Sequence, residues 1–320
     1  MSAAIIKKQK NFLIPAGFAV FFSVVPTILI KFGVIDTWMA GIISNACVNA
    51  ILAISVNIIT GITGQLSIGQ AGFMAIGAYA CISLTLDLSL PLPVSTILAA
   101  LIAAFIGFLI GFPTLKLTGD YLAIVTLGFG EIIRVILTNV RSITGGANGR
   151  KFPVSDTSPA HIKFLVVCAA LVIIIALLQN FLRSSYGRAI MAVREDEIAA
   201  NSSGIGIFRY KMVGFVTAAF VAGLGGALFA ITVGFVKPDI SSFNKSIDYM
   251  IFVVLGGMGS ITGSIIAAVI LTCLQEFLRF LRDYRLIIYP LILIIVMLYR
   301  PQGLLGMKEI SFVKFFSKKQ

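Results

Sequence analysis

Residues 38–86 read WMAGIISNACVNAILAISVNIITGITGQLSIGQAGFMAIGAYACISLTL and contain no charged side chain. A helix needs about 20 apolar residues to cross the hydrocarbon core of a bilayer. This run is therefore long enough for two membrane spans. The glycine-rich stretch TGITGQLSIGQAG at 60–72 lies between them, and we expect the chain to turn there. The run predicts an all-α, polytopic membrane protein.

The composition of the whole chain agrees with this class. Of its 320 residues 58% are hydrophobic and 12% charged, and the mean hydropathy is +1.03, which is too apolar for a soluble domain. We expect one transmembrane domain, residues 1–320, with membrane lipid as its solvent. The net charge of +12 does not indicate nucleic acid, because the cations sit at the edges of apolar runs, as orientation signals do.

Further apolar runs complete the predicted topology. We expect spans at 12–30, 93–115, 121–138, 162–182, 210–236, 249–275 and 286–299. Basic residues flank the first and last spans, so the tails 1–11 and 300–320 are both expected in the cytoplasm. Two cytoplasmic ends require an even number of crossings. Residues 249–275, interrupted by GGMGSITG, are therefore counted as a broken or re-entrant pair, which gives eight or ten helices.

Two glycine-punctuated runs occupy comparable places in the two halves of the chain. Such runs are typical of discontinuous helices that line a transport path, although small residues also serve close helix packing. Both interpretations stay open for each glycine. Polar neighbours in the first run favour the path, because polar groups are costly in lipid. The path candidates are Asn57, Thr60, Gly61, Gly64, Gln65, Ser67, Gly69 and Gln70 in the first run and Gly256, Gly257, Gly259 and Gly263 in the second.

Ionisable side chains within the spans are scarce. Glu131 and Arg134 stand three residues apart on one expected helix face, where they can neutralise each other. They form either a charged element of the path or a structural ion pair. Asn45, Asn49 and Asn57 fall along one face of the second span and provide either a polar lining or hydrogen bonds between helices.

A charged segment interrupts the apolar pattern at 183–211, RSSYGRAIMAVREDEIAANSSGIGIFRYK. Its apolar residues recur near helical spacing, so we expect a helix at the cytoplasmic surface. That helix either lies on the membrane or docks a partner. Consecutive acids at 195–197 favour a partner, because an anionic membrane surface repels them.

The sequence contains none of the motifs of an enzyme. It has no phosphate-binding loop, no GxSxG and no HExxH. The four cysteines lie in apolar segments without metal-binding spacing, and the single histidine, His161, cannot build a metal site alone. We expect no catalytic residue, no metal and no cofactor.

Five ordered motifs resemble a known family. They are NIITGITGQLSIGQAGFMAIGAY, PTLKLTGDYLAIVTLGFGEIIRVILTN, SITGGANG, the segment from SSYGRAIMAVREDEIAANSSGIGIFRYK onward, and YRPQGLLG. Over roughly residues 40–306 they resemble the LivM-type permease of branched-chain amino-acid ABC importers. The resemblance implies a subunit of a bacterial cytoplasmic membrane that pairs with a LivH-type permease, two cytoplasmic ATPases and an extracytoplasmic amino-acid-binding protein.

By the same resemblance, 183–211 is the ATPase-coupling region. Importer permeases carry E-A-A-x-x-x-G there, and Ala199, Ala200 and Gly204 match its A-A-x-x-x-G part. Ile198 stands where the glutamate would, with Glu197 one residue early, so this chain departs from the motif. We expect Arg188, Arg194, Glu195 and Asp196 to set the register with the ATPase, and Ile198, Ala199 and Ala200 to form an apolar seat. Gly204 is expected to end the helix in a left-handed conformation.

The implied function is import of leucine, isoleucine or valine, driven by ATP hydrolysis on partner chains. Related permeases resemble transporters of urea or amides, so another small solute is the first alternative. An ion-coupled carrier would need carboxylates within the membrane, and the uncharged run 38–86 argues against it. A structural scaffold has no use for two glycine-broken segments.

Overall fold

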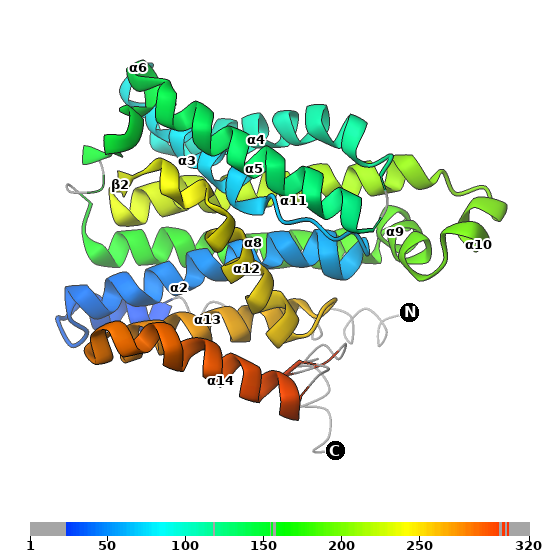
Figure 1. Ribbon diagram of the computed structural model, residues 1–320. Helices are drawn as coiled ribbons and strands as arrows, with labels where there is room; N and C mark the ends of the chain where they lie inside the picture. Colours follow the sequence, from blue (N-terminus) through cyan, green and yellow to red (C-terminus); the bar gives the residue numbers. More distant parts are fainter. Residues whose placement is uncertain are drawn as a thin grey trace, which may run out of the picture.

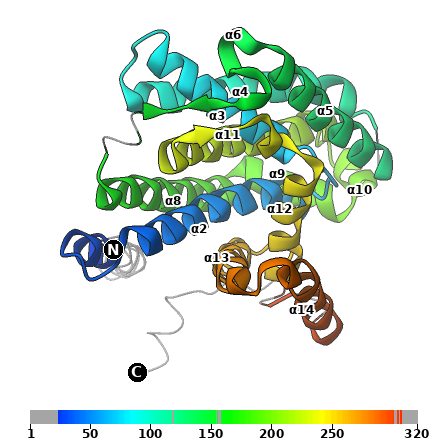
Figure 2. The same ribbon diagram turned by 60° about the vertical axis from the view of Figure 1, so that its left-hand side comes forward.

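The chain forms a bundle of helices, shown in Figures 1 and 2. The computed structural model describes residues 24–117, 119–153, 155, 158–300, 303, 304 and 306. The predicted tail 1–11, most of the predicted span 12–30 and most of the tail 300–320 lie outside these residues.

Six helical segments of the described chain are long and apolar enough to cross a membrane. They are α2 with its π-helical continuation η1 (Thr37–Ile62), α4 (Leu92–Thr114), α5 (Asp120–Asn139), α8 (Ala160–Arg183), α11 (Ile207–Val233) and Ile261–Arg282. Two shorter apolar helices are α3 (Gln70–Leu86) and α14 (Arg285–Tyr299). The predicted all-α polytopic class is confirmed. The helix positions match the predicted spans to within a few residues.

Helix α11 forms the centre of the bundle, packed against α2, α3 and α4. Small residues let the backbones approach closely. A Cβ added to Gly77 of α3 would overlap the Gly223 carbonyl oxygen and lie 2.5 Å from its Cα. A Cβ on Gly226 would lie 2.7 Å from the Met74 carbonyl carbon. Helices α3 and α11 therefore touch backbone to backbone near their middles.

Short irregular elements gather at one end of the bundle (Figure 1). Strand β1 (Arg150–Lys151) pairs antiparallel with β2 (Phe235–Val236), beside α6 (Arg141–Thr144) and the 3-10 turns η2 (Gly146–Asn148) and η3 (Pro238–Ser241). Arg150 also forms an ion pair with Asp87, at the end of α3. This end thus joins the turn after α3 to the segments before α8 and after α11.

The predicted interruption near residue 257 is present. Helix α12 (Phe243–Gly256) ends at Gly257, and α13 begins at Ile261 and ends at Phe277. The two helices pack against each other. The 3-10 segment η4 (Leu278–Tyr284) then leads to α14, which lies at the edge of the bundle (Figure 2). Residues 249–275 therefore contain the predicted break, whereas the predicted count of eight or ten crossings stays a prediction.

Candidate functional site

The first glycine-rich run is a true interruption between two helices. Helix α2 (Thr37–Val56) continues as the π-helix η1 (Asn57–Ile62), and residues 64–69 are not helical before α3 begins. Gly64 has a positive φ of 70°, which a glycine adopts without steric cost. π-helical turns are frequent at functional sites.

Polar side chains are buried at this first break. Asn57, Gln65, Ser67 and Gln70 are each at most 4% exposed. Ser55 donates a hydrogen bond of 2.8 Å to Gln70 Oε1. Within the described residues, several other polar atoms here have no hydrogen-bond partner: Asn57 Nδ2, Thr60 Oγ1, Gln65 Nε2 and Oε1, Ser67 Oγ and Gln70 Nε2.

Such a concentration of unpartnered polar atoms is unusual. More than about 90% of buried polar groups in proteins find a partner, and leaving one unsatisfied costs about 1–3 kcal/mol. The cluster offers both donors and acceptors but no formal charge. It can therefore hydrogen-bond a neutral or zwitterionic solute, or water, at the break.

The second break meets the first. Gly259 has a φ of 91°, and its N–H donates a 2.8 Å hydrogen bond to Asn57 Oδ1. A Cβ on Gly61 would overlap Asn57 Oδ1 and the Gly259 nitrogen. Residues that are about 200 positions apart in the sequence are thus joined in one junction, formed by Asn57, Gly61 and Gly259. We call this the break junction.

Other glycines among the path candidates make close helix contacts. A Cβ on Gly69 would lie 2.6 Å from the Thr126 carbonyl oxygen of α5. Gly256 and Gly263 face each other across α12 and α13, with a Cβ on Gly256 lying 2.5 Å from the Gly263 carbonyl carbon. Gly257 has a φ of 108° and lies against Gly306. The packing interpretation describes the contacts of these four glycines.

Glu131 and Arg134 form the expected pair, with 2.7 Å between Glu131 Oε2 and Arg134 Nε. Glu131 Oε1 also accepts the N–H of Phe243, the first residue of α12, at 3.2 Å. A carboxylate at a helix N-terminus is favoured by the helix dipole. The printed contacts of Glu131 thus hold α5 to the start of α12, which is the structural interpretation of this pair.

The charged segment is two helices rather than the single helix that periodicity predicted. Helix α9 is Ser185–Glu195 and α10 is Glu197–Ser202. Asp196 is extended between them, and its Oδ1 accepts the N–H groups of Ile198 and Ala199 at 2.8 and 3.0 Å. A side chain that caps a helix in this way belongs before its first turn, so the acidic stretch starts a new helix. Both helices lie at the end opposite the strands (Figure 1).

Helix α10 ends at a left-handed glycine, as expected, because Gly204 has a φ of 79°. The N–H of Ile205 bonds to the Ala200 carbonyl at 3.0 Å, and the N–H of Gly204 bonds to the Asn201 carbonyl at 3.0 Å. This is the Schellman pattern. Lys211 of α11 holds the other end of α10 through a 2.6 Å ion pair with Glu197.

The residues of the predicted apolar seat differ in how exposed their side chains are. Ile198 is 81% exposed and Ala199 is exposed, whereas Ala200 is only 4% exposed. The side chain of Ala200 is therefore turned into the chain, and the exposed part of the predicted seat is Ile198 and Ala199. Among the predicted register residues, Glu195 and Asp196 are exposed. Arg188 is exposed and donates to the Arg183 carbonyl at 2.8 Å.

Arg194 differs from the other charges of the segment because its side chain reaches the glycines of both breaks. Its Cγ lies 3.0 Å from the position of a Cβ on Gly64, and its Nη1 lies 3.1 Å from that of a Cβ on Gly259. The sequence suggested no such contact, because no spacing rule relates position 194 to 64 or 259.

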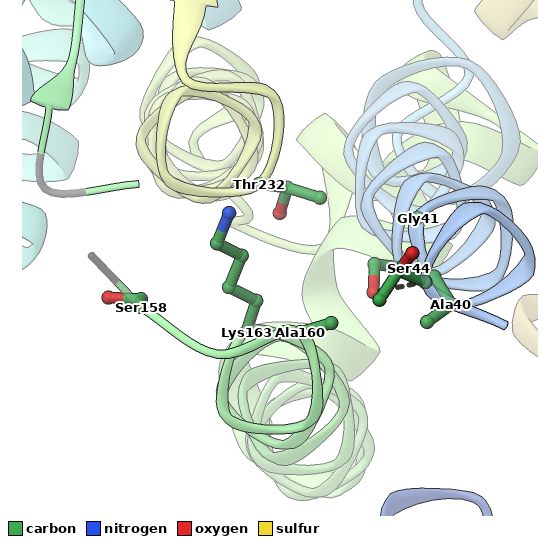
Figure 3. Close-up of a pocket in the computed structure, with 8 residues that line it drawn as sticks. Ala40, Gly41, Ser44, Ser158, Ala160, Lys163 and Thr232 are labelled. Carbon is green, nitrogen blue, oxygen red and sulfur yellow. Dashed lines mark hydrogen bonds between the residues drawn. The ribbon is translucent and has the colours of Figure 1, made fainter. Parts of the chain in front are cut away.

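The opposite end holds a cavity that sequence reasoning missed. Its volume is about 300 Å³, and Ser44 of α2, Lys163 of α8 and Thr232 of α11 line it (Figure 3). Lys163 Nζ donates to Ser155 Oγ at 2.8 Å. A neighbouring hollow of about 320 Å³ reaches Asn45 and Thr272. Asn49 Nδ2 donates to Thr272 Oγ1 at 3.0 Å, so part of the asparagine face of α2 bonds to α13.

Comparison with known proteins assigns the chain to a family. Residues 38–297 match the model of the branched-chain amino acid transport system / permease component family. The chain belongs to this permease family. It is 37% identical over 294 residues to the high-affinity branched-chain amino acid transport system permease protein LivM of Escherichia coli strain K12, covering 80% of this chain and 67% of that protein.

Other relatives place the permease within the same group. LivM of Salmonella typhimurium strain LT2 is also 37% identical, over 286 residues, with the same coverage. The high-affinity branched-chain amino acid transport system permease protein LivH of Escherichia coli strain K12 is 29% identical over 192 residues, covering 59% of this chain and 60% of LivH. No solved structure matches the permease. The resemblance read from the motifs is confirmed, and the permease is a multi-pass membrane protein.

Proposed function

We propose that the chain is the LivM-type permease subunit of an ATP-driven importer that brings leucine, isoleucine or valine into the cytoplasm of a bacterium. One observation carries the proposal most directly. A protruding helix with an 81% exposed isoleucine, Ile198, belongs to the same segment that contacts the break junction through Arg194. The break proposed as the solute path and the exposed surface proposed to bind an ATPase are thus connected within one chain.

The path is the interruption between α2 and α3. Its unpartnered amides and hydroxyls can replace part of the hydration shell of a polar solute, and the break junction closes it against α13. The side chains assigned to solute are Asn57, Thr60, Gln65, Ser67 and Gln70. Uncharged groups bind a solute weakly enough to release it, as transport requires.

The segment 183–211 is the docking surface for an ATPase. Ile198 and Ala199 supply apolar contact, and Glu195 and Asp196 supply charges for register. Full burial of an isoleucine side chain contributes about 1.5–3 kcal/mol. A docked ATPase would therefore gain appreciably from covering Ile198. Both termini are assigned to the cytoplasm, and the single domain 1–320 pairs with a LivH-type subunit and two ATPases.

The substrate class rests on the relatives, whose names specify branched-chain amino acids. The polar cluster at the break would also suit urea or an amide, so these stay as the alternative. An ion-coupled carrier is disfavoured, because the carboxylate within α5, Glu131, is already engaged by Arg134 and the start of α12.

Reconstitution tests the proposal. The chain is co-expressed with a LivH-type permease and the two ATPases, and the complex is placed in vesicles with loaded binding protein outside and ATP inside. We expect ATP-dependent accumulation of labelled leucine and no ATP binding by the chain alone. Uptake driven by an ion gradient without ATP, or tight ATP binding by the isolated chain, would refute the assignment.

A further inference from the structure

Arg194 is the charged residue of the segment whose side chain reaches both breaks. It lies on the last turn of α9, half-buried, and its stem and guanidinium lie beside Gly64 and Gly259 respectively. The two glycines leave the space that this side chain occupies, since a methyl group on Gly64 would lie 3.0 Å from Arg194 Cγ. Helix α9 also packs directly against η1.

The guanidinium is placed where a cation is favoured. Gly64 follows the end of η1, and the C-terminal end of a helix carries partial negative charge from its free carbonyls. Within the described residues, the five ion pairs do not include Arg194. Arg194 Nη1 and the Gly61 carbonyl oxygen lie 3.1 and 3.4 Å from the same point, the position of a Cβ on Gly259, so the guanidinium lies near this partly negative carbonyl.

The consequence is mechanical. The junction itself rests on the hydrogen bond from Gly259 to Asn57 and on the absence of a side chain at Gly61. A displacement of α9 carries the backbone of Arg194, whose Cα lies 3.7 Å from the position of a Cβ on Gly64, and therefore changes the packing of α9 against this glycine. Packed groups of this kind transmit discrete shifts rather than absorbing them.

We propose that Arg194 is the positioning residue that couples the segment 183–211 to the break junction, so that a movement of α9 and α10 opens or closes both breaks together. The step from loop movement to transport rests on the proposed function, whereas the hold on the junction does not. The side chain acts through its apolar stem, which packs beside Gly64, and through its positive charge, which is favoured near the C-terminal end of η1.

The test uses three substitutions and two measurements. Arg194→Met keeps much of the stem and removes the charge, Arg194→Lys keeps both stem and charge, and Arg209→Met is the matched control, because Arg209 is exposed in the first turn of α11. The first measurement is made on the purified chain alone. A single reporter cysteine at Ser67, which is 1% exposed, is labelled in a background without the four native cysteines.

We expect Arg194→Met to increase the labelling rate about tenfold, the size of a typical coupling free energy. Arg194→Lys and Arg209→Met should label at the parent rate. Equal rates in all four proteins would overturn the proposal. So would an increase in Arg209→Met as large as in Arg194→Met, because the effect would then not be specific to the junction.

The second measurement is the ratio of leucine uptake to ATP hydrolysis in the reconstituted complex. We expect Arg194→Met to keep hydrolysis and to lower this ratio about tenfold, with Arg194→Lys restoring most of it. A proportional loss of both activities would mean a purely structural role and would overturn the coupling role. If the parent complex shows no ATP-driven uptake, the proposed function fails, and the labelling result alone decides whether Arg194 holds the junction.

Discussion

Substitution of Gly61 by alanine examines the break junction most directly. The added methyl group would overlap Asn57 Oδ1 and the Gly259 nitrogen, and would lie 3.0 Å from Asn57 Cγ. Two of these atoms form the hydrogen bond that joins the breaks. The backbone nitrogen cannot rotate away as a flexible side chain could, so residues 257–260 have to shift as a unit.

The expected destabilisation has two parts. Added volume in a packed interior costs about 1–3 kcal/mol. Loss of the hydrogen bond, with both groups left buried, costs a further ~1–3 kcal/mol. The better helix propensity of alanine offsets up to about 1 kcal/mol. The free energy of unfolding should therefore fall by about 1–6 kcal/mol, taking these terms together.

The assay is denaturant or thermal unfolding in detergent or bicelles, with Gly41→Ala as the control. Gly41 lies in α2, the helix that continues into η1, and a Cβ there meets nothing within 4 Å, so this variant should be unchanged or up to about 1 kcal/mol more stable. In a double-mutant cycle with Asn57→Ala, the losses of unfolding free energy in the two single variants should sum to at least ~1 kcal/mol more than the loss in the double variant. The reason is that each substitution removes the same hydrogen bond. Equal stability of Gly61→Ala and Gly41→Ala would refute the described junction.

Three further predictions concern the two ends of the bundle. Ile198→Ala should weaken the binding of the separate ATPase chains to the permease without changing the stability of the permease. Ala200→Phe should instead lower the free energy of unfolding of the permease by about 1–3 kcal/mol. The opposite pattern would show that the burial assignment is wrong. Gly204→Val should cost about 1 kcal/mol or more in local stability, seen as faster amide hydrogen exchange in α10, while unchanged exchange would exclude a left-handed requirement. Arg150 lowers the pKa of Asp87 below its ordinary value of 3.8, mainly by hydrogen bonding. The pair therefore stabilises the folded state at neutral pH. This stabilisation is lost as the pH falls below 3.8 and through the lowered pKa of the folded state. Asp87→Asn should therefore remove part of the acid dependence of the unfolding midpoint, and an unaltered pH profile would count against the pair.

Periodicity and composition predicted the helices well because the membrane leaves few alternatives. A span must satisfy its backbone internally and must be apolar over about 20 residues, so α4, α8 and α11 are visible in the sequence. The interruptions were visible for a similar reason, since glycine is unfavourable in a helix interior unless the backbone needs it. Residues 256–263 therefore predicted the end of α12 and the start of α13.

Contacts between distant segments were not visible. The polar character of Gln65 and Ser67 could be read from the sequence, but their lack of hydrogen-bond partners could not. Ala200 and Ile198 share an apolar character, and only the packing of α10 on the chain separates the buried one from the exposed one. The split at Asp196 was missed because the spacing of Ile190, Val193 and Ile198 continues a helical period across it, while a single capping aspartate carries little periodic signal.

The backbone contact between Gly77 and Gly223 also fixes how far any motion of α11 can be amplified. Two backbones in direct contact have no side chains between them that could yield, so α11 can tilt against α3 there more readily than it can slide. About 24 Å of helix separates Gly223 from Ile207, at ~1.5 Å per residue. A tilt of only about 5° about this pivot moves the first turn of α11 by roughly 2 Å. The contact between Gly77 and Gly223 would thus act as a pivot for α11, and the longer part of the helix would move its first turn beside α10.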